Sequence, residues 1–271
     1  MHSEWQHGDP GCFTAYEAAL RYFLFQQRIS AEDHLVTREA LERAIETDPG
    51  YVDAWTSLSL IYQQEYMNNL NPRPGSLERG LKAAQHAVDL DSTSSRAHFA
   101  LAQVNYFMRN LSAFQVHAER AIELNPRNTD TMAMVGIMMG YSGDWERSVE
   151  LTTLAMKLNP HHAGWYYFNT FFNEFRQENY EKALLIAQKI NLPDYWAAWL
   201  ALVITYAQLD QEQDTQKATK ELLRTWPAFE EEYVESGLTV WIFNQPELVE
   251  QVRDSLGKAG LKLREPAEEI N

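Results

Sequence analysis

The side chains in this sequence that could bind a metal are its histidines. His161 and His162 are adjacent in a turn after a helix-ending proline, where we expect both rings to face solvent. Three further histidines, His86, His98 and His117, stand on predicted helices. None of these three has the acidic or histidine partner four residues away that a helical metal site needs. We therefore expect no metal centre, and packing or surface roles for the rings.

Other reactive residue types do not form a catalytic arrangement either. The acidic run Glu230–Glu232 indicates a solvated helix start, which the helix dipole favours. Asn110–Ser112 matches a glycosylation sequon, but no secretion signal supports that use. Cys12 is the single cysteine, so neither an intramolecular disulfide nor a thiolate cluster can form. We find no hydrolase triad, phosphate loop or dinucleotide motif, and predict a non-catalytic chain without a cofactor.

Composition and charge limit the classes of partner that this chain is expected to bind. The 271 residues are 45% apolar and include 8 Trp, enough for a sizeable core. The formal net charge of -15 repels phosphate backbones and anionic lipid head groups, so we expect no direct nucleic-acid binding. No apolar run is long enough for membrane insertion, and the first residues do not resemble a signal peptide. A cytoplasmic location is the expectation.

The elements that position these residues follow a repeat. The phrase AIELNPRN, Ala121–Asn128, returns as AMKLNPHH, Ala155–His162, thirty-four residues later. Steps of similar length mark six phrase ends, at Pro49, Ser92, Pro126, Pro160, Pro193 and Pro227. Between them, apolar residues recur at helical spacing in two blocks per unit, and proline ends the second block. The pattern predicts an all-α chain of repeated helix pairs.

Small and large residues alternate in these units as close helix packing requires. In the unit from Thr129, Gly136 and Ala155 are the small residues expected where the two helix axes approach. The stretches VDAWTSLSLIY and WLALVITYAQL carry the spacing W-x2-L-x3-Y. These units resemble tetratricopeptide repeats. The resemblance implies a right-handed superhelix, an α-solenoid, of about six helix pairs.

The repeat boundaries predict a domain plan. We expect a flexible N-terminus at 1–12 and a repeat array at 13–227, followed by capping helices at 229–262 and a flexible tail at 263–271. Within the array the units cover about 13–50, 51–94, 95–128, 129–162, 163–195 and 196–228. The capping region should contain an amphipathic helix, with Pro246 in its first turn, Leu248, Val252 and Leu256 on one face, and Gly260 as its stop.

The second unit is nine residues too long. Its insert at 63–79 lies in the stretch QQEYMNNLNPRPGSLERG, residues 63–80, which is rich in Pro and Asn but also apolar. We expect it to pack over the neighbouring unit, with ligand contact as the alternative. A first unit that opens with AYEAALRYFLFQQR, Ala15–Arg28, followed by a second unit with this insert, is similar to the C-terminal repeat regions of bacterial class III adenylate or guanylate cyclases and of some winged-helix regulators. That resemblance implies a sensory or docking region, which in membrane-anchored relatives can also be periplasmic.

The repeat resemblance also places candidate binding residues. Its concave positions are Phe99, Gln103, Tyr106, Phe107, Tyr141, Tyr167, Phe171, Glu174 and Phe175. An aromatic groove in an acidic surface suits a protein or peptide with apolar anchors and basic flanks. Arg96 is the one cation at these positions, which argues against a carboxylate clamp. Self-association into a homodimer and a small-molecule sensor inside the superhelix are the alternatives.

Overall fold

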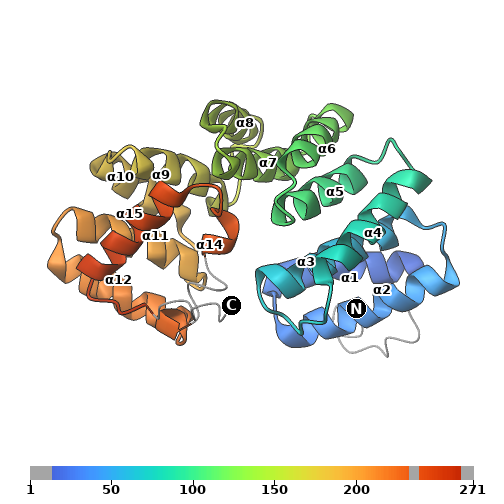
Figure 1. Ribbon diagram of the computed structural model, residues 1–271, viewed down its shortest axis with the longest axis horizontal. Coiled ribbons are helices and arrows are strands. Elements are labelled where there is room, and N and C mark those ends of the chain that lie inside the picture. Colours follow the sequence, from blue (N-terminus) through green and yellow to red (C-terminus); the bar gives the residue numbers. More distant parts are fainter. Residues whose placement is uncertain (1–13, 232–237, 264–271) are drawn as a thin grey trace, which may run out of the picture. The chain divides into compact units, whose positions relative to one another are not determined.

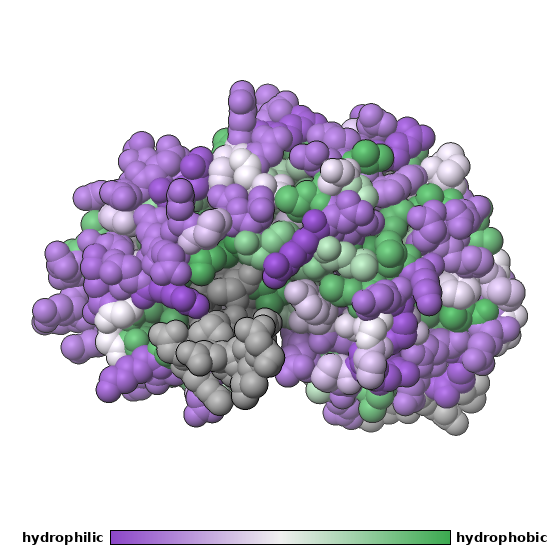
Figure 2. Space-filling model, viewed as in Figure 1, coloured by the Kyte–Doolittle hydropathy of each residue, from purple (hydrophilic) through white to green (hydrophobic). Residues whose placement is uncertain are grey.

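The structure, a computed structural model, describes residues 14–231 and 238–263. All regular elements in these ranges are helical, and they divide into two compact units, Met1–Pro126 and Arg127–Asn271. Each unit is a set of helix pairs joined by short turns (Figure 1). On the face shown in Figure 2, polar side chains cover most of the surface, as the acidic composition requires. None of the described helices is long and apolar enough to cross a membrane.

Unit 1 consists of three helix pairs. Its helices are α1 (Ala15–Arg28), α2 (Ala31–Thr47), α3 (Val52–Met67), α4 (Ser76–Leu90), α5 (Ser95–Phe107) and α6 (Leu111–Leu124). We call the first helix of each pair, here α1, α3 and α5, the A helix. Phe25, Leu41, Leu58, Ile61 and Leu101 are fully buried between the pairs. Large side chains thus fill the space between successive pairs, as the repeat pattern predicts.

Unit 2 continues the same pattern and ends in a different one. Its pairs are α7 (Thr129–Ser142) with α8 (Trp145–Leu158), α9 (Tyr167–Arg176) with α10 (Tyr180–Ile190), and α11 (Trp196–Gln208) with α12 (Glu212–Thr225). The short 3-10 turn η2 (Gly164–Tyr166) precedes α9. The short α14 (Leu238–Trp241) and the longer α15 (Pro246–Lys258) follow. The A helices of this unit are α7, α9 and α11.

One hydrogen bond recurs where a new pair starts. The indole of Trp55 donates to the carbonyl of Pro49 at 2.8 Å, and that of Trp199 donates to the carbonyl of Pro193 at 2.9 Å. His98 takes the tryptophan position in the third pair, with Nε2 3.1 Å from the carbonyl oxygen of Ser92. Each contact joins residues that are six apart in the sequence. It links the first turn of an A helix to the proline or serine that ends the preceding repeat.

Small residues lie where paired axes approach most closely. A Cβ added at Gly136 would lie 2.9 Å from Thr152 Cγ2 and 3.1 Å from the carbonyl oxygen of Ser148, both on the partner helix α8. Ala155 on α8 is fully buried. The predicted fold class, an all-α array of tetratricopeptide-type helix pairs with a C-terminal amphipathic helix, is confirmed. The predicted N-terminus at 1–12 lies outside the described residues, as does the predicted tail at 263–271 except for its first residue.

Candidate binding surfaces

The nine predicted groove residues fall on A helices of both units. Phe99, Gln103, Tyr106 and Phe107 are on α5 of unit 1. The other five, Tyr141, Tyr167, Phe171, Glu174 and Phe175, are on α7 and α9 of unit 2.

Six of the nine do not face solvent, which corrects the expectation of an open aromatic lining. Gln103, Tyr106, Phe107, Tyr141, Phe171 and Phe175 are each at most 6% exposed. Tyr106 packs edge-on against Phe114 of the partner helix, and Phe171 lies 5.7 Å from Phe175 between ring centroids. Burial also raises the pKa of the Tyr141 phenol. The rings are part of the core because the A helices pack closely, so that large side chains on them contact neighbouring helices and are buried.

Phe99, Tyr167 and Glu174 are half-buried and remain candidates. Phe99 packs against the core of unit 1. The Tyr167 ring lies 5.0 Å from the ring of His162, and the Lys189 ammonium lies 5.9 Å from the Tyr167 ring centroid. Glu174 accepts a hydrogen bond from the Asn179 side-chain amide at 2.9 Å. Partner binding by these three residues stays a prediction.

Arg96, the cation of the predicted groove, is engaged inside unit 1. Its guanidinium donates to Asp53 Oδ1 at 3.1 Å and to Ser57 Oγ at 2.9 Å, both on α3. It also lies 4.6 Å from the ring centroid of Phe23 on α1. Arg96 therefore joins the three A helices of unit 1 to one another. This use of the charge agrees with the prediction against a carboxylate clamp.

The histidines have the structural roles expected of them, with one correction. His98 Nδ1 lies 3.1 Å from His117 Nδ1, and burial, followed by the charge of His98, lowers the pKa of His117. His161 is exposed, but His162 is half-buried and stacks on the Tyr166 ring at 4.9 Å, so the expectation of solvent exposure was wrong for His162. Within the described ranges, no three potential ligands come together to hold a metal ion.

The insert of the second pair is fixed by a buried carboxylate. Glu65, near the end of α3, is inaccessible to solvent and accepts hydrogen bonds from Arg38 at 2.9 Å, Arg79 at 2.5 Å and the Arg73 amide at 3.0 Å. Burial alone would raise the pKa of Glu65, but the hydrogen bonds from Arg79, the Arg73 amide and Arg38 outweigh burial and lower it. The carboxylate thus remains ionised and holds the insert to α2 and α4.

A second contact ties the insert to the preceding pair. Asn71 donates to the Ala31 carbonyl at 2.6 Å and its side-chain amide lies 3.2 Å from His34 Nδ1. His34 is fully buried, with Nε2 3.1 Å from the Ile61 carbonyl oxygen. The insert therefore packs over the neighbouring pair, as expected from its apolar composition.

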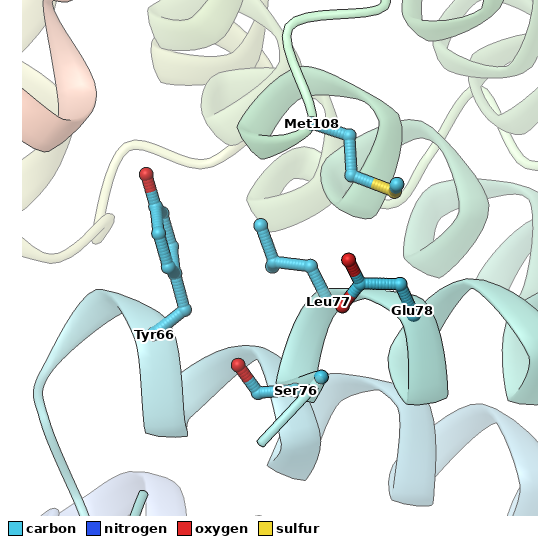
Figure 3. A pocket seen from close by; sticks show the side chains of 6 residues that line it. Tyr66, Ser76, Leu77, Glu78 and Met108 are labelled. Carbon is cyan, nitrogen blue, oxygen red and sulfur yellow. The ribbon is translucent and has the colours of Figure 1, made fainter. Parts of the chain in front are cut away.

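A hollow lies between residues of the insert and the end of the A helix α5. It has a volume of about 330 Å³ and is lined by Tyr66, Gly75, Ser76, Leu77, Glu78 and Met108. Leu77 forms the floor between the Tyr66 ring and the Met108 side chain (Figure 3). Tyr66 and Met108 are each 37% exposed. Sequence reasoning noted Tyr66 as part of an apolar insert but missed Met108, whose one signal is an apolar residue directly after an A helix.

The corresponding surface of unit 2 is covered by α15. Leu248, Val252 and Leu256 on this helix are all at most 3% exposed, which confirms the predicted apolar face. Figure 1 shows α15 lying along α11 in unit 2. Gln251 Nε2 donates to the Phe175 carbonyl at the end of α9 at 2.9 Å and lies 3.1 Å from the Tyr180 hydroxyl. The ends of the A helices in unit 2 therefore hold an amphipathic helix.

Comparison with known proteins agrees with this architecture. No model of a known protein family matches the chain. A segment of 98 residues is 33% identical to a putative adenylate cyclase 3 of Rhizobium meliloti (strain 1021). It covers 36% of this chain and only 17% of that protein, so the similarity concerns about a sixth of the curated relative.

Two solved structures have a similar arrangement of helices. PilF of Pseudomonas aeruginosa superposes with a TM-score of 0.55 at 15% identity, over 79% of this chain and 94% of that one. Cut9, from the anaphase-promoting-complex hetero-tetramer Cut9–Hcn1, superposes with a TM-score of 0.65 at 12% identity, over 90% of this chain and 43% of that one. Both are tetratricopeptide-repeat proteins. The protein is thus an all-helical repeat protein with the tetratricopeptide fold.

Proposed function

We propose that this chain is a non-catalytic scaffold that binds a protein or peptide. The observation that carries the proposal is the packing of α15, an amphipathic helix of this chain, against the ends of the A helices in unit 2. Leu248, Val252 and Leu256 are buried there, and Gln251 donates a hydrogen bond to the Phe175 carbonyl at the end of α9, which also accepts from the Glu178 amide. Apolar anchors with a few directional polar contacts are the usual chemistry of helix recognition in a groove.

The setting of this scaffold is a bacterial signalling protein, in which the chain serves as a regulatory or sensory region. The 98-residue similarity to a putative adenylate cyclase supports this setting. The chain's net charge of -15 favours a partner with basic flanks next to its apolar anchors. Phe99, Tyr167 and Glu174, which keep partial exposure, are further candidates for partner contact.

An unbiased peptide-display selection on the full-length chain tests the proposal. We expect enrichment of one class of apolar and basic sequences, and a matching synthetic peptide should bind in fluorescence anisotropy. The chain incubated with magnesium and ATP or GTP should form no cyclic nucleotide or diphosphate. Failure to enrich any sequence over a denatured-chain control, or nucleotide turnover by the pure chain, would contradict the proposal.

Self-association is the second candidate, and the outer face of α1 favours it. Tyr16, Leu20, Phe23 and Leu24 recur at helical spacing and are 40–60% exposed, opposite the buried residues of the same helix. A second copy presents the same face, so a symmetric pair would bury both. Sedimentation over a range of concentrations should then approach twice the chain mass of 31.4 kDa. Leu20→Lys with Leu24→Lys should abolish the increase, whereas a constant monomer mass would remove this candidate.

A further inference from the structure

The hollow of unit 1 has a counterpart in unit 2, and in unit 2 the counterpart is filled. Phe107 at the end of α5 and Tyr141 near the end of α7 stand thirty-four residues apart, as do Tyr141 and Phe175. These residues are therefore equivalent positions of the repeat. In unit 2 the A-helix ends lie under α15, whereas in unit 1 the ends of α3 and α5 border the open hollow.

The contacts of α15 define how a helix crosses A-helix ends. Asn244 donates to the Ser142 carbonyl at the end of α7, Gln251 to the Phe175 carbonyl at the end of α9, and Lys258 to Gln208 at the end of α11. These three donors stand seven residues apart, with Asn244 just before α15 and Gln251 and Lys258 within it. Seven residues of α-helix rise about 10 Å, close to the distance of about 8–10 Å between packed helix axes. Gln251 and Lys258 therefore place one donor on each of two successive repeats.

We propose that the hollow of unit 1 binds an amphipathic helix of a partner protein, laid across the ends of α3 and α5. This rests on the proposed function and names its ligand. One aliphatic side chain of the helix enters between Tyr66 and Met108 and covers Leu77, which removes three apolar surfaces from water. Side-chain donors seven residues apart along the helix meet the carbonyls at the two A-helix ends.

Charge at the rim selects among such helices. Glu78, in the first turn of α4, lines the hollow and is exposed. The other nearby carboxylate, Glu65, is already paired with Arg38 and Arg79. A lysine or arginine beside the aliphatic anchor would approach Glu78 without desolvating it, which favours a basic over an acidic partner and makes binding salt-dependent.

We assign the hollow to a different protein because α15, the amphipathic helix at the C-terminal end of the described residues, is already in place in unit 2. In α15, Leu248, Val252 and Leu256 are buried in unit 2, so neither this helix nor the same helix of a second copy is free to fill the hollow. Detaching it would expose three aliphatic side chains, each worth about 1.5–3 kcal/mol when buried.

The test uses the full-length chain and three fluorescent helical peptides as probes. The first carries leucines at i, i+4 and i+8 with lysine flanks, the second has the same residues in scrambled order, and the third has glutamate flanks. We expect the first to bind at least about tenfold more tightly than the other two. Glu78→Gln should narrow the difference between lysine and glutamate flanks.

Location of the peptide is tested by a matched pair of variants. Met108→Glu should weaken binding of the first peptide at least about tenfold. Val116→Glu introduces the same charge on α6 of the same unit, at a side chain that is 67% exposed, and should leave binding unchanged. In a methyl NMR spectrum of the wild-type chain, the Met108 signal should shift on titration and the signals of the buried Met132 and Met138 should stay.

Each remaining outcome decides the proposal. Equal weakening by both variants, or a peptide that leaves the Met108 methyl unmoved, overturns the hollow as the site. Peptides from the display selection that bind but ignore Met108→Glu would do the same and leave the scaffold proposal standing. A doubling of mass that Met108→Glu abolishes would assign the hollow to a second copy. No binding by any selected or designed peptide would remove both proposals.

Discussion

Units 1 and 2 use the same helix pairs but treat the ends of their A helices differently. In unit 1, charged side chains around Glu65 fix an insert, and a hollow stays open beside it. In unit 2, the equivalent surface is closed by the apolar face of α15. In unit 2, Asn244 and Gln251 donate to carbonyls at the ends of α7 and α9, whereas in unit 1 Glu65 accepts from arginine side chains and the Arg73 amide. The difference supports the proposal that the open edge of unit 1 accepts a partner helix, as the edge of unit 2 accepts α15.

The largest expected effect on the difference between the units comes from removing the buried carboxylate of unit 1. Glu65→Gln should destabilise the chain by about 3–5 kcal/mol, because Arg38 then remains buried without its counter-charge. Hydrogen exchange should accelerate in α2, α3 and α4 and remain unchanged in α9 and α11. Glu123→Gln, at a surface ion pair with Arg120, is the matched control and should cost at most about 1 kcal/mol. Equal costs for the two variants would show that the insert is not held by Glu65.

The corresponding change in unit 2 is a substitution that weakens the packing of α15. Leu256→Ala removes a fully buried side chain and should destabilise the seat of the helix by about 2–5 kcal/mol. Hydrogen exchange should then accelerate in α15 and at the end of α11. Leu185→Ala on α10, where the side chain is 62% exposed, is the control and should change stability by at most about 0.5 kcal/mol. An unaltered exchange rate in α15 would mean that its apolar face contributes little to holding it.

The repeat and the face of α15 could be predicted from sequence because both are periodic. Proline phrase ends set the pair boundaries, and Leu248, Val252 and Leu256 recur every four residues on one helix face. The predicted groove was less accurate. Phe171 and Phe175 satisfy the same spacing whether they face a partner or the core, since periodicity assigns a side of the helix but not what covers that side.

The hollow and the Glu65 cluster could not be predicted, for a related reason. Glu65 lies 27 residues from Arg38 and 14 from Arg79, and no local pattern pairs groups at such separations. The burial of Phe171 also changes an experiment. The groove hypothesis predicts that Tyr167→Ala combined with Phe171→Ala abolishes partner binding at intact helicity, but the second substitution introduces a core cavity. Tyr167→Ala, at a half-buried side chain, is the better test of the groove.

Acidification should lower the stability of unit 1 through the protonation of His34, and this distinguishes it from unit 2. Burial lowers the pKa of His34 below its ordinary value of 6.5, and the charges of Arg38 and Arg73 lower it further. The hydrogen bond to Ile61 and the charge of Glu65 raise it, but they do not outweigh burial. The folded chain therefore binds fewer protons than the unfolded chain, and stability is lost as pH falls through 6.5 toward the lowered pKa.

Urea titrations at pH 7.5 and 5.5 measure this loss. His34→Gln should be less stable than the wild type at pH 7.5 and should depend less on pH, with hydrogen exchange responding in α2 and the insert. His161→Gln, at an exposed ring, is the control and should keep the wild-type slope. A His34→Gln slope equal to that of the wild type would assign the acid sensitivity to other groups, such as His117, whose pKa burial also lowers.

The smallest expected effect concerns the donor that aligns α15 with the repeat. Gln251→Ala removes the hydrogen bond to the Phe175 carbonyl and the contact with the Tyr180 hydroxyl, and should cost about 1 kcal/mol because water can reach this half-buried site. Tyr180→Phe removes the second of these contacts alone. A double-mutant cycle should give a coupling of about 0.5 kcal/mol or more. Strict additivity would mean that the contact with Tyr180 contributes nothing. If Gln251→Ala alone also cost nothing, apolar burial would suffice to hold α15, and the seven-residue register of donors would lose its value for recognising a partner helix in unit 1.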